Sequence, residues 1–408
     1  MRILFFSYAY PNPWQPELAT FNRTMIAGLA QNHDVRVISP IGFVSRWRRW
    51  RCGLDRHADF VAVPGVPAEY PTYYYTPKIC RAHYHRFMAW SVGGNLRRAI
   101  RAFRPDVVLS YWAHPDGAVA VRFAHAGGVP AVQIVGGSDV LLLARDPRRR
   151  AVIFDVLHRA DAVIAVSRDI AATLAKAGLE THKLHVVRRG IDRQVFHAAD
   201  RKLARQRLGL PEDRPVLLGV GRLVPVKGWP DWLLAARMLV DRGLRPACYV
   251  LGEGPLDGEL RRLIREYGLE RIVEFRGPQP QAELARWYQA ADVTVLASHS
   301  EGVPNVLLET IACGGSFVAT AVGGIPEIAD LRCDRLAPAR QPAALADAIA
   351  HRLAHPPPPD YVRRWMPASL EQAAADIGAV LESVCAAPTL AFPRKLPALD
   401  EPVGSAAS

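Results

Sequence analysis

The chain has 408 residues, half of them apolar, and a formal net charge of +12 with an isoelectric point near 9.7. This length exceeds one ordinary domain and predicts two or three, and the apolar content suffices for a sizeable core in each. The charge favours anionic partners such as anionic lipid, nucleic acid or phosphorylated substrates, and does not by itself choose among them.

The six cysteines are scattered and form no C-x-x-C pair, which argues against a zinc site or a secreted disulfide scaffold and fits a reducing cytosol. The first apolar run is too short for the core of a signal peptide, and no apolar stretch approaches the roughly 20 residues of a membrane-spanning helix. We therefore expect a cytoplasmic protein, peripheral on the inner face of the cytoplasmic membrane where it contacts lipid.

Short β-branched runs alternate with helical patterns in the first half of the chain. A buried strand is predicted in residues 1–7, and further strands at 35–39, 107–110, 131–135, 162–166 and 184–187. Helical spacing is present at 21–31 and 169–177. This alternation predicts an α/β fold with a parallel, doubly wound sheet, a Rossmann-like domain at residues 1–198.

The alternation stops in a polar and basic stretch at 192–215 and then restarts. Strands are predicted at 216–220, 248–251, 272–275, 293–296 and 317–320, each followed by a helix. They predict a second Rossmann-like domain at residues 199–364. Four prolines at 356–359 predict a stiff connector, residues 365–386 a helix that crosses back to the first domain, and residues 387–408 a disordered tail.

Two carboxylates flank a predicted helix start in the second domain. Glu301 lies in the loop before Asn305, where the helix is expected to begin, and Glu309 lies inside the helix. A helix N-terminus offers unpaired N–H groups and the positive end of a dipole, which suits a phosphate, and Glu309 can accept hydrogen bonds from the vicinal hydroxyl groups of a ribose. Taken alone, this spacing more often marks a solvated loop residue and a helix-surface residue.

A glycine-containing turn follows the first strand of the second domain. Gly221 lets the backbone approach a ligand, and Arg222 and Lys227 place two cations where a diphosphate would lie. The residue order is not that of a Walker A loop. By itself, such a turn is more often a plain strand-to-helix connection with solvated charges.

Seven ordered segments of the second half resemble the retaining GT-B glycosyltransferases of family 4. The segments are 186–192, 221–228, 252–256, 275–277, 291–293, 301–309 and 323–327. The resemblance implies two Rossmann-like domains with an interdomain cleft. It also implies transfer of a hexose from a UDP- or GDP-sugar to a lipid-linked or saccharide acceptor, in the synthesis of cell-envelope polysaccharide or glycolipid.

The same resemblance implies roles for individual residues of a donor site. Arg222 and Lys227 would bind the diphosphate, Glu309 would hold the ribose, and Glu301 would face the donor sugar, while the backbone at 276–278 would contact the nucleobase. The full implied donor set is Gly221, Arg222, Lys227, Arg276, Gly277, Pro278, Glu301, Gly302, Val303, Pro304, Asn305 and Glu309.

The first half resembles the family less closely. Ala19 stands where family members carry a glycine in the loop after the first strand, and histidines common in the family are replaced by Leu109, Tyr111 and Gly136. His114 is a candidate replacement for a lost catalytic histidine, with a structural or acceptor-side role as the alternative.

The resemblance implies a retaining reaction in which the acceptor hydroxyl attacks on the face from which the nucleoside diphosphate leaves. Arg222, Lys227 and helix N–H groups would stabilise the leaving group, so no metal and no other cofactor is expected, in agreement with the lack of any Asp-x-Asp pair. A non-catalytic nucleotide-sugar-binding protein and a GT-B sugar-nucleotide epimerase share this layout. The sequence contains no recognised nucleic-acid-binding motif, so nucleic acid is not an expected partner.

Basic residues alternate with aromatic residues in the first half. The segments are 46–51, 81–86 and 97–104. Aromatic rings favour the headgroup zone and Arg or Lys is attracted to anionic lipid, so these segments predict an anionic membrane surface as a partner. The alternatives are a solvated face packed on the core and a surface that grips a soluble phosphorylated acceptor.

Overall fold

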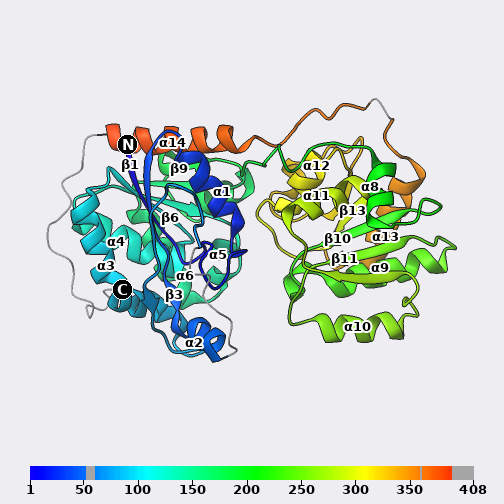
Figure 1. Ribbon diagram of the computed structural model, residues 1–408, viewed down its shortest axis with the longest axis horizontal. Coiled ribbons are helices and arrows are strands. Elements are labelled where there is room, and N and C mark those ends of the chain that lie inside the picture. The colour runs from blue at the N-terminus through cyan, green and yellow to red at the C-terminus, as the bar shows by residue number, and fades with distance from the viewer. Residues whose placement is uncertain (52–59, 359–360, 388–408) are drawn as a thin grey trace. The chain divides into compact units, whose positions relative to one another are not determined.

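The computed structural model describes residues 1–51, 60–358 and 361–387, which form two compact units (Figure 1). The first unit comprises residues 1–166, 171–187 and the described residues from Glu371 onward. The second comprises residues 167–170 and 188–370. The predicted tail from residue 388 lies outside the described residues.

A parallel sheet forms the centre of the first unit, with strand order β4-β2-β1-β6-β7-β8-β9. The strands are β1 (Arg2–Phe6), β2 (Asp34–Ile38), β4 (Ala68–Glu69), β6 (Val107–Tyr111), β7 (Ala131–Val135), β8 (Ala162–Ala165) and β9 (Leu184–Val186). Every residue of β6, β7 and β8 is buried, as expected for strands covered by helices on both faces. The strands predicted for this half are confirmed to within about two residues.

Helices on both faces of this sheet complete the doubly wound unit. They are α1 (Thr20–Leu29), α3 (Tyr84–Phe103), α4 (Ala118–Ala126), α5 (Ser138–Leu141), α6 (Pro147–Arg159) and α7 (Arg168–Lys176). An excursion after β2 adds β3 (Ile41–Gly42), paired in parallel with β5 (Thr72–Tyr73), and helix α2 (Phe43–Arg51). These excursion elements were not predicted, because two-residue strands carry no periodic signal.

The second unit has its own parallel sheet, with strand order β12-β11-β10-β13-β14-β15. The strands are β10 (Val216–Val220), β11 (Ala247–Leu251), β12 (Val273–Gly277), β13 (Val293–Leu296), β14 (Phe317–Thr320) and β15 (Arg335–Ala337). Its helices are α8 (Arg201–Leu208), α9 (Trp229–Asp241), α10 (Asp257–Glu266), α11 (Gln281–Ala290), α12 (Asn305–Ala312) and α13 (Pro342–Ala354). Apolar cores cover both faces of this sheet, so the predicted second Rossmann-like layer is confirmed.

The second unit begins at Arg188, eleven residues before the boundary expected at residue 199. Ile191 and Phe196 explain the difference, because both are buried in a core shared with β10 and α12. Residues 192–215, whose polarity was interpreted as a break between the two domains, also contain α8. Asp200 caps that helix by accepting a hydrogen bond from Leu203 N at 2.7 Å.

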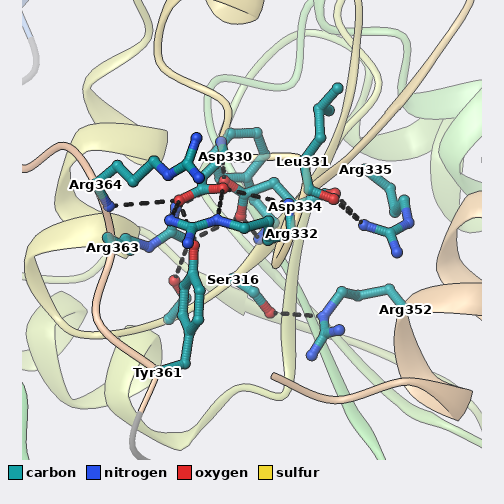
Figure 2. Close-up of polar contacts among 12 residues, drawn as sticks. Ser316, Asp330, Leu331, Arg332, Asp334, Arg335, Arg352, Tyr361, Arg363 and Arg364 are labelled. Carbon is teal, nitrogen blue, oxygen red and sulfur yellow. Dashed lines mark hydrogen bonds and ion pairs between the residues drawn. The ribbon is translucent and has the colours of Figure 1, made fainter. Parts of the chain in front are cut away.

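An ion-pair cluster fixes the segment before the last helix to the second unit (Figure 2). The Arg363 guanidinium donates to both oxygens of Asp334, at 2.7 and 2.8 Å, and to Gly315 O at 2.7 Å. Both members of the pair are buried, and Tyr361 donates to Asp330 beside them. The bidentate geometry satisfies the buried charges, which holds the segment firmly in place.

The last helix, α14 (Leu370–Ala386), packs on the first unit (Figure 1). Ile377 and Leu381 on its inner face are buried. Gly378 lies against His33, and the Cys385 thiol donates to Asp106 O at 3.5 Å. Within the parts of the chain that the structure describes, no helix is both long enough and apolar enough to span a membrane.

Candidate active site

Glycines allow the loops at the carboxyl ends of β10, β11 and β12 to lie in direct contact. Gly221 N donates to Leu251 O and Gly252 N donates to Gly277 O, both at 2.9 Å. At Gly252, with φ of 138°, a Cβ would lie 2.1 Å from Gly221 O. Only glycine fits there, so the close contact between these loops depends on the glycine at position 252.

The loop after β13 contacts the loops after β10 and β14 in the same way. A Cβ on Gly228, with φ of 63°, would lie 2.0 Å from Ala297 O. One on Gly323, with φ of 56°, would lie 1.9 Å from Glu301 O. The five loops at this end of the sheet, where doubly wound domains bind ligands, are therefore packed backbone against backbone.

The structure brings Lys227 and Glu301 together. Lys227 Nζ donates to Glu301 Oε1 at 2.6 Å, and Ser298 Oγ donates to the same oxygen at 2.7 Å. The two charged side chains are 20% and 13% exposed. Among the described residues Glu301 Oε2 has no hydrogen-bond donor, so one oxygen of this carboxylate is left for a ligand.

Arg222 is held differently. Its carbonyl accepts a hydrogen bond from Trp229 Nε1 at 2.8 Å, which fixes the backbone. Its side chain is exposed, and the residues that the structure describes give the guanidinium no hydrogen bond or ion pair. A planar donor group that is anchored at its backbone and unpaired at its tip is suited to an anion.

Helix α12 begins after Pro304, as predicted. Gly302 O accepts a hydrogen bond from Gly324 N at 2.8 Å, and Val303 is buried in the core, so this loop is fixed from both sides. Asn305 Oδ1 accepts a hydrogen bond from Arg189 Nη1 at 3.1 Å. The Asn305 side chain therefore does not cap its own helix, and among the described residues the N–H groups of Asn305 and Val306 have no partner and remain open to a ligand.

Glu309 lies on α12 with its carboxyl group turned into the domain. The Tyr288 hydroxyl donates to Oε2 at 2.7 Å. Burial raises the pKa of Glu309 to about 7, and the hydrogen bond from Tyr288 opposes that rise. No described residue bonds to Oε1, which leaves this oxygen to accept hydrogen bonds from a ligand.

The segment 276–278 has most of its polar groups engaged. Gln279 Nε2 donates to Arg276 O at 2.7 Å, and Gly277 O accepts the bond from Gly252 N. The Arg276 guanidinium pairs with Glu274 at 2.7 Å. Each carbonyl keeps one acceptor position, and Pro278 brings no N–H group.

Histidine 114 lies in the first unit, within the irregular turn Ala113–Gly117, and is 2% exposed. Its Nε2 is 3.3 Å from His85 Nδ1, and both nitrogens are 3.1 Å from Ala82 O. Burial lowers the pKa of each ring to about 4, so both imidazoles are neutral at pH 7.

His114 lies at the wall of a cavity of about 510 Å³ within the first unit. The cavity lies beyond the carboxyl ends of β1 and β6, beside the β3–β5 excursion and the start of α6. Its lining is Tyr8, Asn12, Gln15, Leu18, Pro40, Ile41, Gly42, Ser45, Tyr73, Tyr75, Lys78, Arg81, Tyr84, Trp112, His114, Pro115, Leu143 and Arg149.

The loop after β1, which forms one wall of this cavity, is held by a buried carboxyl group. Asp116 Oδ2 accepts from Ser7 Oγ at 2.8 Å and from Tyr8 N at 2.9 Å. Burial raises the pKa of Asp116 to about 7. Farther along, Ala19 adopts the left-handed conformation, with φ of 49°, at the position where a glycine was expected.

Two family matches together cover most of the chain. Residues 200–366 match the family described as glycosyl transferases group 1, and residues 18–195 match glycosyltransferase family 4. The chain belongs to the family 4 glycosyltransferases. The family resemblance predicted from the sequence is therefore confirmed.

Relatives of this family 4 chain have names that refer to different products and substrates. The D-inositol 3-phosphate glycosyltransferase of Streptosporangium roseum is 38% identical over 54% of this chain, and the match covers only 55% of that relative's length. The putative teichuronic acid biosynthesis glycosyltransferase TuaC of Bacillus subtilis is 28% identical over 86% of this chain and 88% of its own length.

Solved structures agree on the fold. The HepE protein of Anabaena, determined in complex with UDP, has a TM-score of 0.66 and 19% identity over 94% of this chain and 97% of its own. HepE was also determined with UDP-glucose. Two parallel-sheet α/β units of this kind confirm the predicted GT-B class, while identity this low informs on the fold alone.

Three positions of this family 4 chain belong to the site geometry and were missed as site residues. Ser298 lies two residues after β13 and three before Glu301, a spacing that was available in the sequence. Tyr288 gave no local signal, and Arg189 lies in a segment that resembles the family but did not indicate a contact with α12, because the two residues reach this helix from 21 and 116 positions away. Across the described residues, no group of three or more His, Cys, Asp or Glu side chains could hold a metal ion.

Proposed function

We propose that this chain transfers a hexose from a nucleoside diphosphate sugar to a lipid-linked or saccharide acceptor, in cell-envelope polysaccharide or glycolipid synthesis, with retention and without a metal. The observation that supports this best is the unpaired Arg222 guanidinium, on the same loop as the Lys227–Glu301 pair. UDP-glucose is a first donor to test because HepE was solved with it. D-Inositol 3-phosphate is a first acceptor to test because relatives carry it in their names.

In this proposal the donor diphosphate binds one cation that has no partner among the described residues, Arg222, and one that is paired with Glu301, Lys227. Arg222 binds it through paired N–H groups, and Lys227 shifts part of its interaction from Glu301 to the phosphate. The first N–H groups of α12 add the positive end of the helix dipole. Glu309 Oε1 accepts the ribose hydroxyl protons in hydrogen bonds, and Glu301 Oε2 faces the sugar.

The reaction breaks the bond from the anomeric carbon to the diphosphate oxygen and forms one from that carbon to the acceptor oxygen. The acceptor hydroxyl enters on the face from which the diphosphate leaves, and its proton passes to the departing phosphate oxygen. Negative charge grows on the leaving group, so cations and N–H groups already in place act most strongly in the transition state. These groups do the electrostatic work of a metal.

The first experiment is a thermal-shift screen of UDP-, GDP- and ADP-sugars, because a ligand that binds only the folded state raises its stability with concentration. NMR of the product formed from the stabilising donor then gives the anomeric configuration. A product of inverted configuration contradicts the mechanism. Binding without release of nucleoside diphosphate to any acceptor indicates a non-catalytic binding protein, and an altered sugar still on its nucleotide indicates an epimerase.

Metal independence has its own measurement. We expect the rate of nucleoside diphosphate release to be unchanged in excess EDTA, because Arg222, Lys227 and α12 neutralise the leaving group. Loss of activity in EDTA, restored by magnesium or manganese, contradicts this part of the proposal.

We also propose an anionic membrane surface as a partner of the first unit. Trp50, Trp90 and Trp47 are 76%, 75% and 51% exposed, and Tyr74 packs edge-on against Trp90 at 6.3 Å between ring centroids. Arg46 departs from the patch expected from the sequence, because its guanidinium bonds to Thr72 and lies over the ring of Trp14. Exposed rings beside cations suit the headgroup zone.

Co-sedimentation with liposomes of varied anionic content tests this surface. Binding by the full chain should rise with anionic lipid and fall steeply with salt, since each cation near the surface contributes about 1 kcal/mol. Replacing Arg48, Arg49 and Arg51 with Ser should release the protein. The matched triple Arg261→Ser, Arg262→Ser and Arg265→Ser, on exposed positions of α10, should not. Equal loss in both triples would contradict this patch as the anchor.

A further inference from the structure

The cavity of the first unit collects positive charge from three separate elements. Lys78 comes from the loop after β5, Arg81 from a single helical turn before α3, and Arg149 from the first turn of α6. Among the described residues that line this cavity, none is Asp or Glu. Three cations that converge on one cavity without a lining carboxylate repel one another, and an anionic ligand would relieve that repulsion.

Arg149 is the most enclosed of the three cations. Its side chain is 14% exposed, and its Nε is buried without a hydrogen bond in the described structure. The nearest carboxylate oxygen is Asp146 Oδ2, at 3.8 Å. Asp146 is 45% exposed, and its Oδ1 is taken by the cap bond from Arg148 N at 3.0 Å. The Arg149 charge is therefore only loosely compensated inside the protein.

The position of Arg149 on its helix is unfavourable in the absence of an anion. Arg148, Arg149 and Arg150 occupy the first turn of α6, where the positive end of the helix dipole favours negative charge. Arg148 and Arg150 extend into solvent, where the penalty is screened, whereas Arg149 turns into the cavity. An anion in the cavity would be attracted both to the guanidinium and to the helix end.

Aromatic rings form another part of the lining. Tyr73 and Tyr75 stack with ring centroids 5.0 Å apart, and Tyr84 packs against Tyr75 at 5.2 Å. Tyr8 and Trp112 pair at 5.7 Å. Flat aromatic surfaces pack against the C–H faces of a sugar ring, and a cavity of about 510 Å³ lies within the size range of small-molecule sites.

We propose that this cavity binds the phosphate group of a phosphorylated acceptor, with Arg149, Arg81 and Lys78 as the cations and the aromatic rings against the adjoining sugar. The inference rests on the proposed function, which gives the chain an acceptor. It adds the place in the fold and the three cations that hold the phosphate of such an acceptor, a sugar or polyol that is either free in solution or part of a lipid headgroup.

Calorimetric titration of the full chain with glucose 6-phosphate and with glucose tests the proposal without requiring turnover. Glucose 6-phosphate should bind about tenfold or more tightly than glucose, because only the phosphate forms charge-assisted hydrogen bonds. Arg149→Ala should remove this preference. Arg148→Ala, one residue away on the same turn but directed to solvent, should change the affinity by less than about twofold.

Further variants keep the outcome decisive. Lys78→Ala and Arg81→Ala alter exposed side chains, so they replace Arg149→Ala if that variant does not fold, and each should weaken glucose 6-phosphate several-fold. Arg222→Ala should leave this binding unchanged, which separates the cavity from the donor site. If Arg148→Ala and Arg149→Ala weaken binding equally, or if only Arg222→Ala does so, the proposal is overturned.

Two further measurements separate the phosphate source and the underlying function. Binding of the protein to phosphatidylcholine vesicles that contain phosphatidate, and not to vesicles without it, indicates a lipid-borne phosphate if this binding requires Arg149 but not Arg148. Binding of glucose 6-phosphate alone with the same dependence reports a soluble acceptor, and either result supports the proposal. Normal UDP-sugar binding with no Arg149 effect on any probe refutes the cavity proposal alone, whereas failure to bind any nucleotide sugar refutes the proposed function.

Discussion

The two units present ligand-binding surfaces that are built in opposite ways. In the second unit, five loops pack backbone against backbone through glycines, and Lys227 and Glu301 satisfy each other at 2.6 Å. In the first unit, the cavity is lined by bulky rings and by cations such as Arg149 that lack close partners. One surface is completed by the backbone and the other by side chains.

This difference has a physical basis in what each surface is proposed to bind. A diphosphate is the same in every nucleotide sugar, so backbone N–H groups and two cations suffice, and the glycines that permit them are fixed by sterics. An acceptor differs from enzyme to enzyme, and its recognition depends on side chains that vary freely around one scaffold. The four predictions below test this contrast.

The largest effect is expected where backbone meets backbone. Gly323→Ala should lower the free energy of unfolding by about 4 kcal/mol and abolish donor binding, because the new methyl group would lie 1.9 Å from Glu301 O in a left-handed conformation. Chemical denaturation and donor titration measure the two effects. Gly258→Ala, in open space on α10, is the matched control and should stabilise by about 0.5–1 kcal/mol. If Gly323→Ala and Gly258→Ala change the free energy of unfolding and the donor affinity to the same extent, the backbone of the loops is not in direct contact.

Burial raises the pKa of a carboxyl group in each unit, that of Asp116 in the first and that of Glu309 in the second. The ordinary pKa of an unfolded carboxyl group is about 4, so the folded state binds the proton more tightly. The stabilisation from the neutral form is complete below about pH 4 and is lost as the pH rises through about 7. In urea denaturation from pH 4 to 8, Asp116→Asn should remove a decrease in the free energy of unfolding on the order of 3 kcal/mol that the parent protein shows. If the free energy of unfolding of both proteins depends on pH in the same way, the burial assigned to Asp116 is contradicted.

Donor binding should respond to single side chains by smaller amounts. Arg222→Ala and Glu309→Gln should each weaken nucleotide-sugar binding by about 1–3 kcal/mol, because one removes an anchored cation and the other a ribose acceptor. Calorimetric titration measures both. Arg276→Ala is the comparison, since that guanidinium is already paired with Glu274 and should matter less. Unchanged affinity in both Arg222→Ala and Glu309→Gln would show that the donor site lies elsewhere.

The smallest effect is expected in the loop after β1. Ala19→Gly should change the free energy of unfolding by no more than about 1 kcal/mol, because the relief of a left-handed alanine is offset by the greater freedom of glycine in the unfolded chain. Thermal denaturation measures it. Ala30→Gly, just after α1 in the right-handed region, is the control and should only destabilise. A large gain in Ala19→Gly would mean that the first unit stores strain comparable to that of the donor loops.

The sequence predicted more of the second unit than of the first. Strands such as β10 and β11 are runs without a polar side chain, and the glycines at 221 and 228 mark turns that few other residues can adopt. Helix α3 was missed although Met88, Val92, Leu96 and Ile100 recur at four-residue spacing and are buried. This spacing is sufficient to predict the helix from the sequence.

The acceptor-side cavity was beyond sequence reasoning for a different reason. Its cations, Lys78, Arg81 and Arg149, lie in two short irregular segments and one helix, and only the fold brings them to one space. The basic, aromatic-rich segments did predict a charged surface near residues 46–51 and 81–86. They could not distinguish Arg46, which bonds inward, from the residues that face solvent, because that distinction depends on tertiary contacts.

The return of the chain to the first unit through α14 determines how the protein can be divided into fragments. The chain enters the second unit at residue 188 and leaves it near residue 370, and residues 167–170 also belong to the second unit, so more than one covalent connection joins the two units. A single protease cut at any one connection would leave them linked. A fragment ending at residue 187 would lack α14 and expose the apolar surface that Ile377 and Leu381 cover. Splitting the gene at this point should therefore succeed only when the last helix is supplied as a second peptide.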